Sequence, residues 1–431
     1  MPGAEAPAPE PPAEPAPAPL VESARPTKPR GHARPVRELH PAPVRPSSRP
    51  GPAPLEVVRT REGGEIRRGT GGALRELRTP GGTVVRYLYG GRRRVETPRP
   101  GGGLVHAEGT GLRGYVQTPL QVRGQALVRR SIVADGAVAA RIYRPWAYRG
   151  DTFNLYLPSS YWRAGFYDWA RRPWSRLVYY RWGWKAQPWF RRSRPYFRPS
   201  RCYTGPVFWL TDFMLGATLE EAYQADLDDG LAGTGTDDPG AALTPVVQQA
   251  MADEVRLLVE QEQAEQQALA QDQPLPPWPR PSLFSGRRPR VLLVAGSVPA
   301  WSGDQEWLLP EGTVLQLAGP PPAGASRADV VVLASRGPSF TRGTVVSVAL
   351  GDLVELQNRM RATLDQGLAY LQAHPGGQLP GLPGGAQGRV DPPWADGLQP
   401  DPAAPAELSR AARDAAAAEQ GLLAEAPPDA R

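Results

Sequence analysis

The most constraining feature of this chain is a segment, residues 143–197, that is rich in both aromatic rings and prolines. It holds nineteen of the chain's 34 Phe, Trp and Tyr residues. Pro occurs six times between residues 145 and 199, and proline breaks helix interiors because it lacks a backbone donor. We therefore expect loops and short strands here, with rings stacked on one another and on Arg guanidinium planes.

The same segment is the candidate binding surface. One interpretation is a self-packed block, because soluble proteins rarely leave a large apolar patch open. The other is a contact surface for sugars or for single-stranded nucleic acid, since Trp, Tyr and Arg dominate interface hot spots. Both alternatives stay open. The candidate binding residues, including two from a later segment, are Trp146, Tyr148, Tyr161, Trp162, Trp169, Trp174, Trp182, Trp184, Trp189, Arg191, Arg192, Trp301 and Trp307.

Residues 55–142 predict a meander of β-hairpins. Runs such as TVVRYLYG and QALVRRSIVAD alternate apolar and polar positions, and GG, TPGG and DG turns separate them. Because side chains of a strand alternate between its two faces, we expect Arg on one face of this sheet and Val, Leu, Ile and Tyr on the other.

Two helices are predicted after the aromatic segment. The first follows Pro206, with Asp212 and Glu220 facing away from its apolar side. The second has Thr244 as its N-cap and Pro245 in its first turn. Its Gln- and Glu-rich far end is polar all round, which predicts a solvated extension or a weak coiled coil. Its apolar stripe consists of Val247, Met251, Val255 and Leu258.

Residues 288–350 predict a small β domain. Five Val- and Leu-rich runs (RVLLVA, EWLL, TVLQLAG, ADVVVLAS and TVVSVAL) are separated by turn-forming residues. A compact five-stranded barrel would bury them. Asp352 then caps a helix whose apolar positions recur at steps of three or four: Leu353, Leu356, Met360, Leu364, Leu368 and Leu371.

These elements divide the chain into six segments and predict a fold that is mainly β with helices and has disordered termini. Pro 52 and Gly 47 together are nearly a quarter of the chain, with much of the excess at its ends. The segments are a disordered Pro/Ala/Arg-rich arm (1–54), the hairpin meander (55–142), the aromatic/Arg-rich segment ending in a helix (143–228), a linker and helix (229–287), the barrel plus helix (288–373) and a low-complexity tail (374–431) with an Ala-rich helical stretch near 406–424.

The charge is positive and uneven. The chain carries a formal net charge of +7 and has a pI of about 9.7. The window 130–201 alone has fifteen Arg and Lys against three Asp, a net +12. Such a basic window favours polyanionic partners.

Signatures of catalysis and of cofactor binding are weak. Cys202 is the one cysteine, and the four histidines are not at ligand spacing. His106 is expected in a turn, and Asp304 and Glu306 are expected in a turn between two tryptophans. We therefore predict no catalytic residue, no metal and no cofactor, and a protein that is not an enzyme.

Several phrases carry a resemblance to known bacterial families. The piece GGALRELRTPGGTVVRYLYGGRRR resembles one or two degenerate YD repeats, the hairpin units of Rhs-type shells. The order YRPWAYRGDTFNLYLPSSYWRAGFYDWA, VYYRWGWKAQPWF and FWLTDFMLGATLEEAYQ, over roughly residues 60–372, resembles an uncharacterised family of acidobacterial type. The resemblance implies an exported protein with a C-terminal module similar to Src-homology-3 domains, and it brings no catalytic residues.

The function expected from the sequence is therefore that of a non-enzymatic binding or scaffold protein of the cell envelope. Its ligand would be a wall polymer, a glycan or a protein partner, held by the aromatic and Arg surface. The alternative is a nucleic-acid-binding protein that uses the basic aromatic segment. No apolar run approaches the roughly 20 residues of a membrane span, and the first twenty residues are not a leader. We expect the envelope, periplasm or exterior if a leader lies upstream, and the cytoplasm otherwise.

Overall fold

A computed structural model of the chain describes residues 56–69, 72–88, 93–109, 111–134, 136–228, 240–273, 275, 283–284, 288–296, 298–303, 305–376 and 378–425. The chain divides into two compact units, Met1–Arg45 and Pro46–Arg431, and every described residue lies in the second. The predicted arm 1–54 and Asp304 lie outside the described residues. The fold is mixed α and β with large antiparallel sheets, and it is not mainly β as the sequence predicts.

The N-terminal part of this unit is a ten-stranded antiparallel sheet in which each strand pairs with the next one in the chain. The predicted meander is present, and it extends beyond residue 142 to the end of β10. Its strands are β1 (Glu56–Arg59), β2 (Glu65–Arg68), β3 (Leu74–Arg78), β4 (Val84–Tyr87), β5 (Arg93–Arg99), β6 (Gly103–Glu108), β7 (Arg113–Val122), β8 (Gln125–Ala134), β9 (Ala137–Tyr148) and β10 (Asp151–Leu157).

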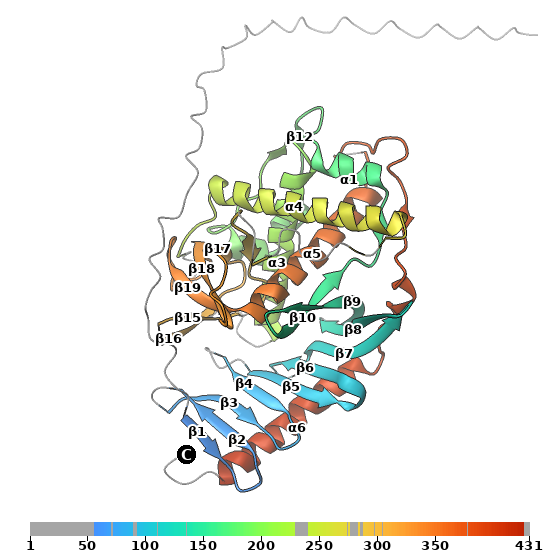
Figure 1. Cartoon of the computed structure of the whole chain (residues 1–431). Coiled ribbons are helices and arrows are strands. Elements are labelled where there is room, and N and C mark those ends of the chain that lie inside the picture. The colour runs from blue at the N-terminus through green and yellow to red at the C-terminus, as the bar shows by residue number, and fades with distance from the viewer. Residues whose placement is uncertain are drawn as a thin grey trace, which may run out of the picture. The chain divides into compact units, whose positions relative to one another are not determined.

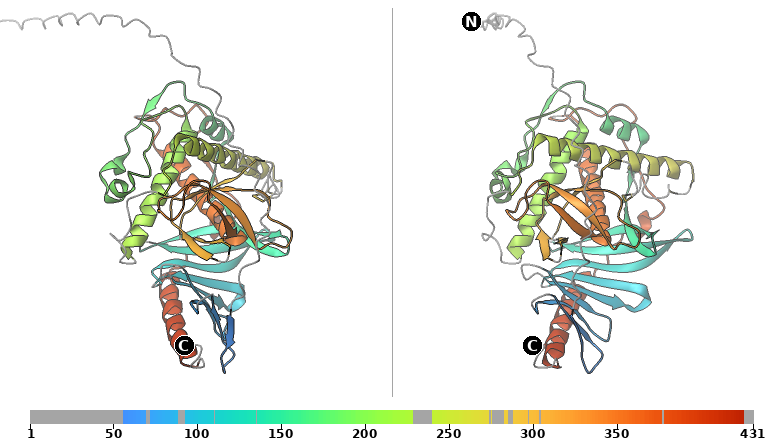
Figure 2. Two further views of the ribbon diagram at one scale, coloured as in Figure 1. Left: turned by 90° about the vertical axis from the view of Figure 1, so that its left-hand side faces the viewer. Right: turned by 60° about the vertical axis from the view of Figure 1, so that its left-hand side comes forward.

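One face of this sheet is apolar and is covered by the C-terminal helix. Ile66, Leu77 and Val85 are at most 1% exposed on that face. Helix α6 (Ala404–Glu425) lies along it and adds Leu408 and Leu422 to the same core (Figures 1 and 2). The helical stretch expected near 406–424 is therefore present. It is docked on the meander, because the strands leave an apolar face that must be buried.

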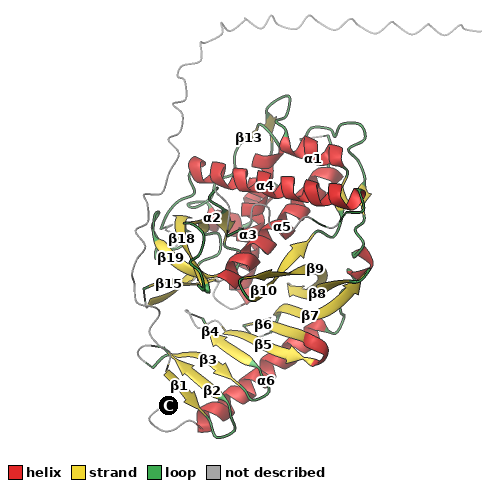
Figure 3. Ribbon diagram, viewed as in Figure 1, coloured by secondary structure: helices red, strands yellow, loops and turns green. Residues whose placement is uncertain are grey.

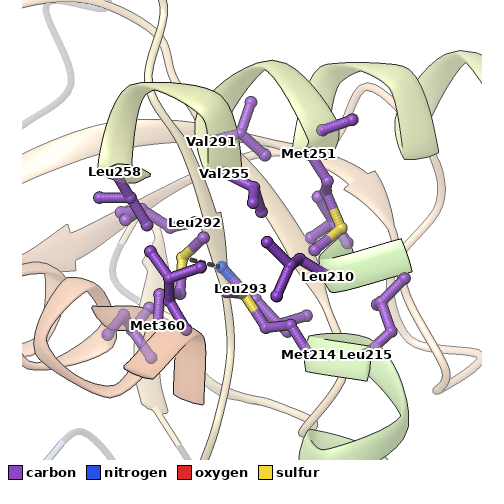
Figure 4. Close-up of a cluster of buried hydrophobic side chains, with 14 of the residues drawn as sticks. Leu210, Met214, Leu215, Met251, Val255, Leu258, Val291, Leu292, Leu293 and Met360 are labelled. Carbon is purple, nitrogen blue, oxygen red and sulfur yellow. Dashed lines mark hydrogen bonds between the residues drawn. The ribbon is translucent and has the colours of Figure 1, made fainter. Parts of the chain in front are cut away.

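The helices of the middle of the chain pack beyond the other end of the sheet, over β10 (Figure 3). The longest three share a core with β14, to which Leu210, Met251 and Met360 contribute (Figure 4). Both predicted leucine and valine stripes are buried in this core. The helices are α1 (Ala164–Arg171), α2 (Pro188–Ser193), α3 (Pro206–Asp228), α4 (Pro245–Ala270) and α5 (Leu350–Ala373).

The small β domain has six strands where the sequence predicts five. They form one antiparallel sheet of order β14-β17-β18-β19-β15-β16. The additional strand is β15, whose pairing with β19 starts at Ala300, directly after Pro299. A proline within a run argues against a central strand, so this strand was missed. The strands are β14 (Val291–Leu293), β15 (Val298–Ser302), β16 (Gln305–Leu309), β17 (Val314–Leu317), β18 (Arg327–Ala334) and β19 (Val345–Ala349).

After β10 the aromatic segment forms two-residue strands, as predicted, but it also forms the short helices α1 and α2, which the sequence did not predict. β11 (Tyr161–Trp162) pairs with β20 (Arg389–Val390), and β12 (Val178–Tyr179) pairs with β13 (Cys202–Tyr203). The ring of Trp182 stacks on Trp184 at 4.9 Å and on Trp209 at 5.0 Å between centroids. Trp209 in turn stacks on Tyr370 of α5 at 5.4 Å. A column of rings thus joins the segment to α3 and α5.

Asp212 does not face solvent, so that prediction is wrong. The side chain is 2% exposed and accepts hydrogen bonds from the Tyr203 hydroxyl and the Ser200 amide, both at 2.7 Å. Burial raises the pKa of Asp212 to about 6, although both hydrogen bonds act in the opposite direction. Donors from β13 and from the loop before it offset the cost of burying this carboxyl group.

The polar end of α4 is also buried, which contradicts the predicted solvated extension. Glu262 and Glu265 are 0% and 1% exposed. Arg361 of α5 donates to Glu265 at 2.7 Å, and the Tyr161 hydroxyl donates to the same carboxylate at 2.9 Å. A guanidinium from α5 and a hydroxyl from β11 thus replace the water that a polar helix face would otherwise need.

Two predicted caps differ in detail. The N-cap of α5 is Ala349, and Asp352 lies in the first turn of that helix instead of capping it. Thr244 does occupy the N-cap of α4 with Pro245 next to it, but its side chain makes no cap hydrogen bond.

Candidate binding cleft

A cleft of about 2100 Å³ runs between the meander and the elements opposite it. Its first wall is the face of β2–β9 that α6 does not cover. Its second wall consists of the C-terminal half of α3, the first turns of α5 and the edge of the small sheet. The lining includes ten arginines and ten carboxylates, so the cleft has mixed charge and is not a basic groove.

The first wall carries a row of charged side chains that crosses the strands. Arg67 lies opposite Glu76, and Glu76 lies opposite Arg86. The guanidinium of Arg86 joins Glu76 at 3.0 Å and Glu96 at 3.2 Å. The period-2 alternation of these strands places all these side chains on one face. We call this set the ionic row: Arg67, Glu76, Arg86, Glu96, His106 and Glu108.

His106 closes the ionic row between two carboxylates. Its Nδ1 is 3.4 Å from Glu96 and its Nε2 is 3.5 Å from Glu108. Burial alone would raise the pKa of Glu96, but His106 and Arg86 hold it at about 2. The pKa of Glu108 is likewise well below its usual range, because His106 and neighbouring arginines outweigh its burial. Both glutamates are therefore carboxylates at neutral pH. The sequence predicts His106 in a turn, but the residue lies within β6.

Rings continue the row toward the helices. Tyr115 stacks on His106 with centroids 4.7 Å apart and planes at 4°. The Arg130 guanidinium lies 4.3 Å from the ring centroid of Tyr115 and 4.2 Å from that of Tyr143. It also donates a hydrogen bond of 2.9 Å to the Glu355 carboxylate on α5. Burial raises the pKa of Tyr115 to about 12, so the ring stays neutral.

Ion pairs connect the two walls of the cleft. Arg94 of the sheet reaches Asp352 of α5 at 3.6 Å. At the other end, Arg75 of β3 reaches Glu306 of β16 at 3.1 Å. Burial raises the pKa of Asp352 and that of Glu306, and the facing arginines act against the shift. The pairs therefore hold the small sheet and α5 in register with the meander.

Twelve of the thirteen predicted binding residues divide into three groups, and Trp301 stands apart from them. Tyr161, Trp162, Trp174, Trp182 and Trp189 are at most 9% exposed and belong to the main core. Arg191 is exposed on α2, and Arg192 lies 4.0 Å from Asp226. The half-buried rings that pack against the core are Trp146, Tyr148, Trp169, Trp184 and Trp307.

Trp301 is the candidate that lines the cleft. Its ring is half-buried, and the Arg327 guanidinium lies 3.6 Å from its centroid. The same part of the cleft contains Glu306, which lies in β16 and not in the predicted turn, and which pairs with Arg75. The structure thus brings one predicted ring to the cleft and places the others in or against the core.

The sequence analysis did not single out the ionic row. Its signal is present in the strands RVET and LVHAE, where charged residues recur at every second position. Recognising it as a site needs the second wall, which comes from residues more than a hundred positions later. Period-2 charge alone is equally typical of a solvated sheet face.

The described part of the chain contains neither a cluster of metal-ligating side chains nor a helix that could span a membrane. Within those residues, three or more His, Cys, Asp or Glu side chains do not gather in an arrangement that could hold a metal ion. Among the described helices none has the length and apolarity to cross a membrane. Comparisons of the chain with family models, with curated proteins and with solved structures find no match.

Proposed function

We propose that this chain is a non-enzymatic binding or scaffold protein of the cell envelope, and that the cleft receives its ligand. The ligand would be a wall polymer that bears peptides, a glycan or a protein partner. The observation that carries the proposal is the ionic row along an open cleft of about 2100 Å³. A peptide-bearing polymer presents carboxylates and amines along one strand, and a row of alternating charge complements it.

The ion pairs of the ionic row can exchange their partners for charged groups of a ligand. The side chain of Arg86 is 40% exposed and that of Glu96 is 26% exposed. Ion pairs between partly exposed groups contribute on the order of 1 kcal/mol. A ligand carboxylate can therefore compete with Glu96 for Arg86, while a ligand amine binds the glutamate.

The geometry of His106 supports the non-enzymatic part of the proposal. Each of its ring nitrogens faces a carboxylate oxygen within 3.5 Å, so neither points freely into the cleft as a proton acceptor. Its stacked neighbour Tyr115 has a pKa of about 12 because it is buried. A general base needs a pKa near the working pH and a free lone pair.

Trp301 adds the aromatic part of the proposed recognition. An indole beside a charged row can stack on a sugar ring or on a peptide side chain. The envelope location and the Src-homology-3-like class of the small sheet belong to this proposal, and they come from the family resemblance of the sequence.

The test is a pelleting assay with insoluble peptidoglycan over a salt series. We expect the wild-type protein to pellet at low salt, and less of it to pellet as salt screens the row. Arg86→Gln should weaken binding about fivefold. Arg410→Gln, on the exposed side of α6, is the matched control and should bind as the wild type does. The proposal fails if no pelleting occurs at any salt, or if the two variants behave alike.

The second candidate is nucleic-acid binding through the basic segment. Eight of its ten cations between Asp168 and Asp212 are exposed. Phosphate neutralisation predicts an affinity that falls steeply with salt. A gel-shift titration with single-stranded DNA at several salt concentrations would exclude this candidate if the affinity stayed constant.

A further inference from the structure

Strand β12 and the residue before it expose two apolar side chains on one face. Leu177 is 53% exposed and Tyr179 is 71% exposed, the most exposed large hydrophobic side chain among the described residues. Between and after them, Val178 and Tyr180 are 4% and 9% exposed. Alternation along the strand therefore directs Val178 and Tyr180 into the core, and Leu177 and Tyr179 outward together.

Contacts on the buried side of β12 fix the position of this face. Val178 pairs with Tyr203 of β13, and the Tyr203 hydroxyl accepts a 2.7 Å hydrogen bond from the Trp182 indole. The Tyr180 hydroxyl is 3.0 Å from that of Tyr370 on α5. A surface fixed in this way loses little conformational entropy when it binds.

The surroundings of this face are strongly basic. The sequence from residue 169 to residue 211 contains ten Arg and Lys and no Asp or Glu. Arg176 and Arg181 flank the strand directly, and both are exposed. Exposed apolar side chains with cations on both sides match a surface that is apolar inside and anionic outside.

We propose that the β12 face, consisting of Arg176, Leu177, Tyr179 and Arg181, docks on an anionic lipid bilayer. Tyr partitions into the membrane interface, Leu inserts its chain among the acyl groups, and each arginine gains from anionic headgroups. Nucleic acid fits the cations equally well, but it offers no apolar phase for Leu177, which has no ring to stack on a base. The docking would be peripheral, and it is independent of the cleft and of its ligand.

Vesicle co-sedimentation tests the proposal with pure lipid and the full chain. We expect binding to vesicles of phosphatidylcholine with about a third phosphatidylglycerol, and at least tenfold weaker binding to phosphatidylcholine alone. Leu177→Ser with Tyr179→Ser should weaken binding about 30-fold, because 53% of Leu177 and 71% of Tyr179 are still available for burial. Arg176→Gln with Arg181→Gln should also weaken it about 30-fold, about fivefold for each charge.

Matched controls separate docking from general stickiness. Leu227→Ser with Val246→Ser removes two exposed apolar side chains elsewhere, of 42% and 40% exposure, and should leave binding unchanged. Arg410→Gln with Arg413→Gln on α6 should also leave it unchanged. All four substituted residues of the β12 face are exposed, so the variants should melt as the wild type does, which thermal unfolding checks.

Three results would overturn the proposal. Equal binding to neutral and anionic vesicles would remove the role of the arginines. Full binding by the Leu177→Ser/Tyr179→Ser variant would leave only nonspecific attraction between charges. Tighter binding to a single-stranded oligonucleotide than to anionic vesicles, lost with the same arginines, would assign this face to nucleic acid. None of these results bears on peptidoglycan pelleting, which reports on the cleft.

Discussion

Replacing Arg361 should destabilise the protein more than any exposed arginine does. This guanidinium is 0% exposed, and it donates to Glu265 at 2.7 Å and to the Tyr156 carbonyl at 2.8 Å. Two further carboxyl groups lie near it: burial raises the pKa of Glu262 well above its usual range and that of Asp365 to about 6. The Arg361 guanidinium is therefore the partner that offsets the cost of burying the Glu265 carboxylate.

The size of the effect follows from what Arg361→Met leaves behind. The methionine fills much of the same space, but Glu265, which is 1% exposed, loses the guanidinium that pairs with it at 2.7 Å. Breaking a buried ion pair in this way costs about 3–5 kcal/mol. For a unit of this length the entropy of unfolding is about 0.8 kcal/mol per kelvin, so the melting temperature should fall by about 4–6 °C.

Urea unfolding and thermal melts of four proteins measure the effect. They are the wild type, Arg361→Met, Glu265→Gln and the double variant, in which the amide still accepts from the Tyr161 hydroxyl. We expect the double variant to recover at least about 2 kcal/mol relative to the sum of the single losses. Arg359→Met, two residues away in a partly exposed pair with Glu221, should cost no more than about 1 kcal/mol. A loss below about 1 kcal/mol for Arg361→Met, or strictly additive losses, would refute the reasoning.

Three further predictions concern stability. Because the folded pKa of Asp212 is about 6 against a usual 3.8, the folded state binds its proton more tightly than the unfolded state does, and stability falls as pH rises from about 4 to about 6. Asp212→Asn should therefore gain up to about 3 kcal/mol on the wild type between pH 4 and pH 7 in urea titrations, and a constant difference would contradict this. Gly114→Ala should cost at least about 3 kcal/mol, since φ is +143° and the new Cβ would lie 2.0 Å from the His106 carbonyl oxygen. The control Gly124→Ala, whose φ is also positive but whose Cβ would meet open space, should cost about 1–2 kcal/mol. Thermal unfolding of both variants measures the two losses. Leu408→Ala should cost about 2–5 kcal/mol in urea unfolding by opening a cavity between α6 and the sheet, whereas a loss below about 1 kcal/mol would argue against that docking.

Local patterns in the sequence predicted the elements whose partners are generic. The stripe Val247, Met251, Val255 and Leu258 is buried as expected, because any apolar neighbour can cover an apolar stripe. The alternation of the meander likewise predicted its apolar and charged faces. The C-terminal end of the meander was predicted less well. Strand β10 belongs to the sheet, but its composition assigns it to the aromatic segment.

Local patterns in the sequence predicted the exposure of several polar residues wrongly. Asp212 and Glu265 are polar residues that a helical pattern places on the water side, and both are buried. Their partners, Tyr203 for Asp212 and Arg361 for Glu265, come from other elements, one of them 96 positions away. A polar helix face does not reveal whether water or a distant side chain will satisfy it.

The candidate site was predicted only in part for a related reason. The rings were expected to bind or to pack, and the structure packs most of them because the column through Trp182 and Trp209 joins three elements. The cleft depends on pairs such as Arg94 with Asp352, which link segments far apart in the chain. Only Trp301 belongs both to the predicted set and to the lining of the cleft.

The most direct test of the central claim is isothermal titration calorimetry with soluble wall fragments. The claim is that the mixed-charge cleft binds the peptide of a wall polymer. We predict that a disaccharide bearing a tetrapeptide binds, that the same disaccharide without the peptide binds at least tenfold more weakly, and that Arg86→Gln weakens the first interaction about fivefold. Equal affinity for both fragments, or an unchanged affinity in the variant, would contradict the account.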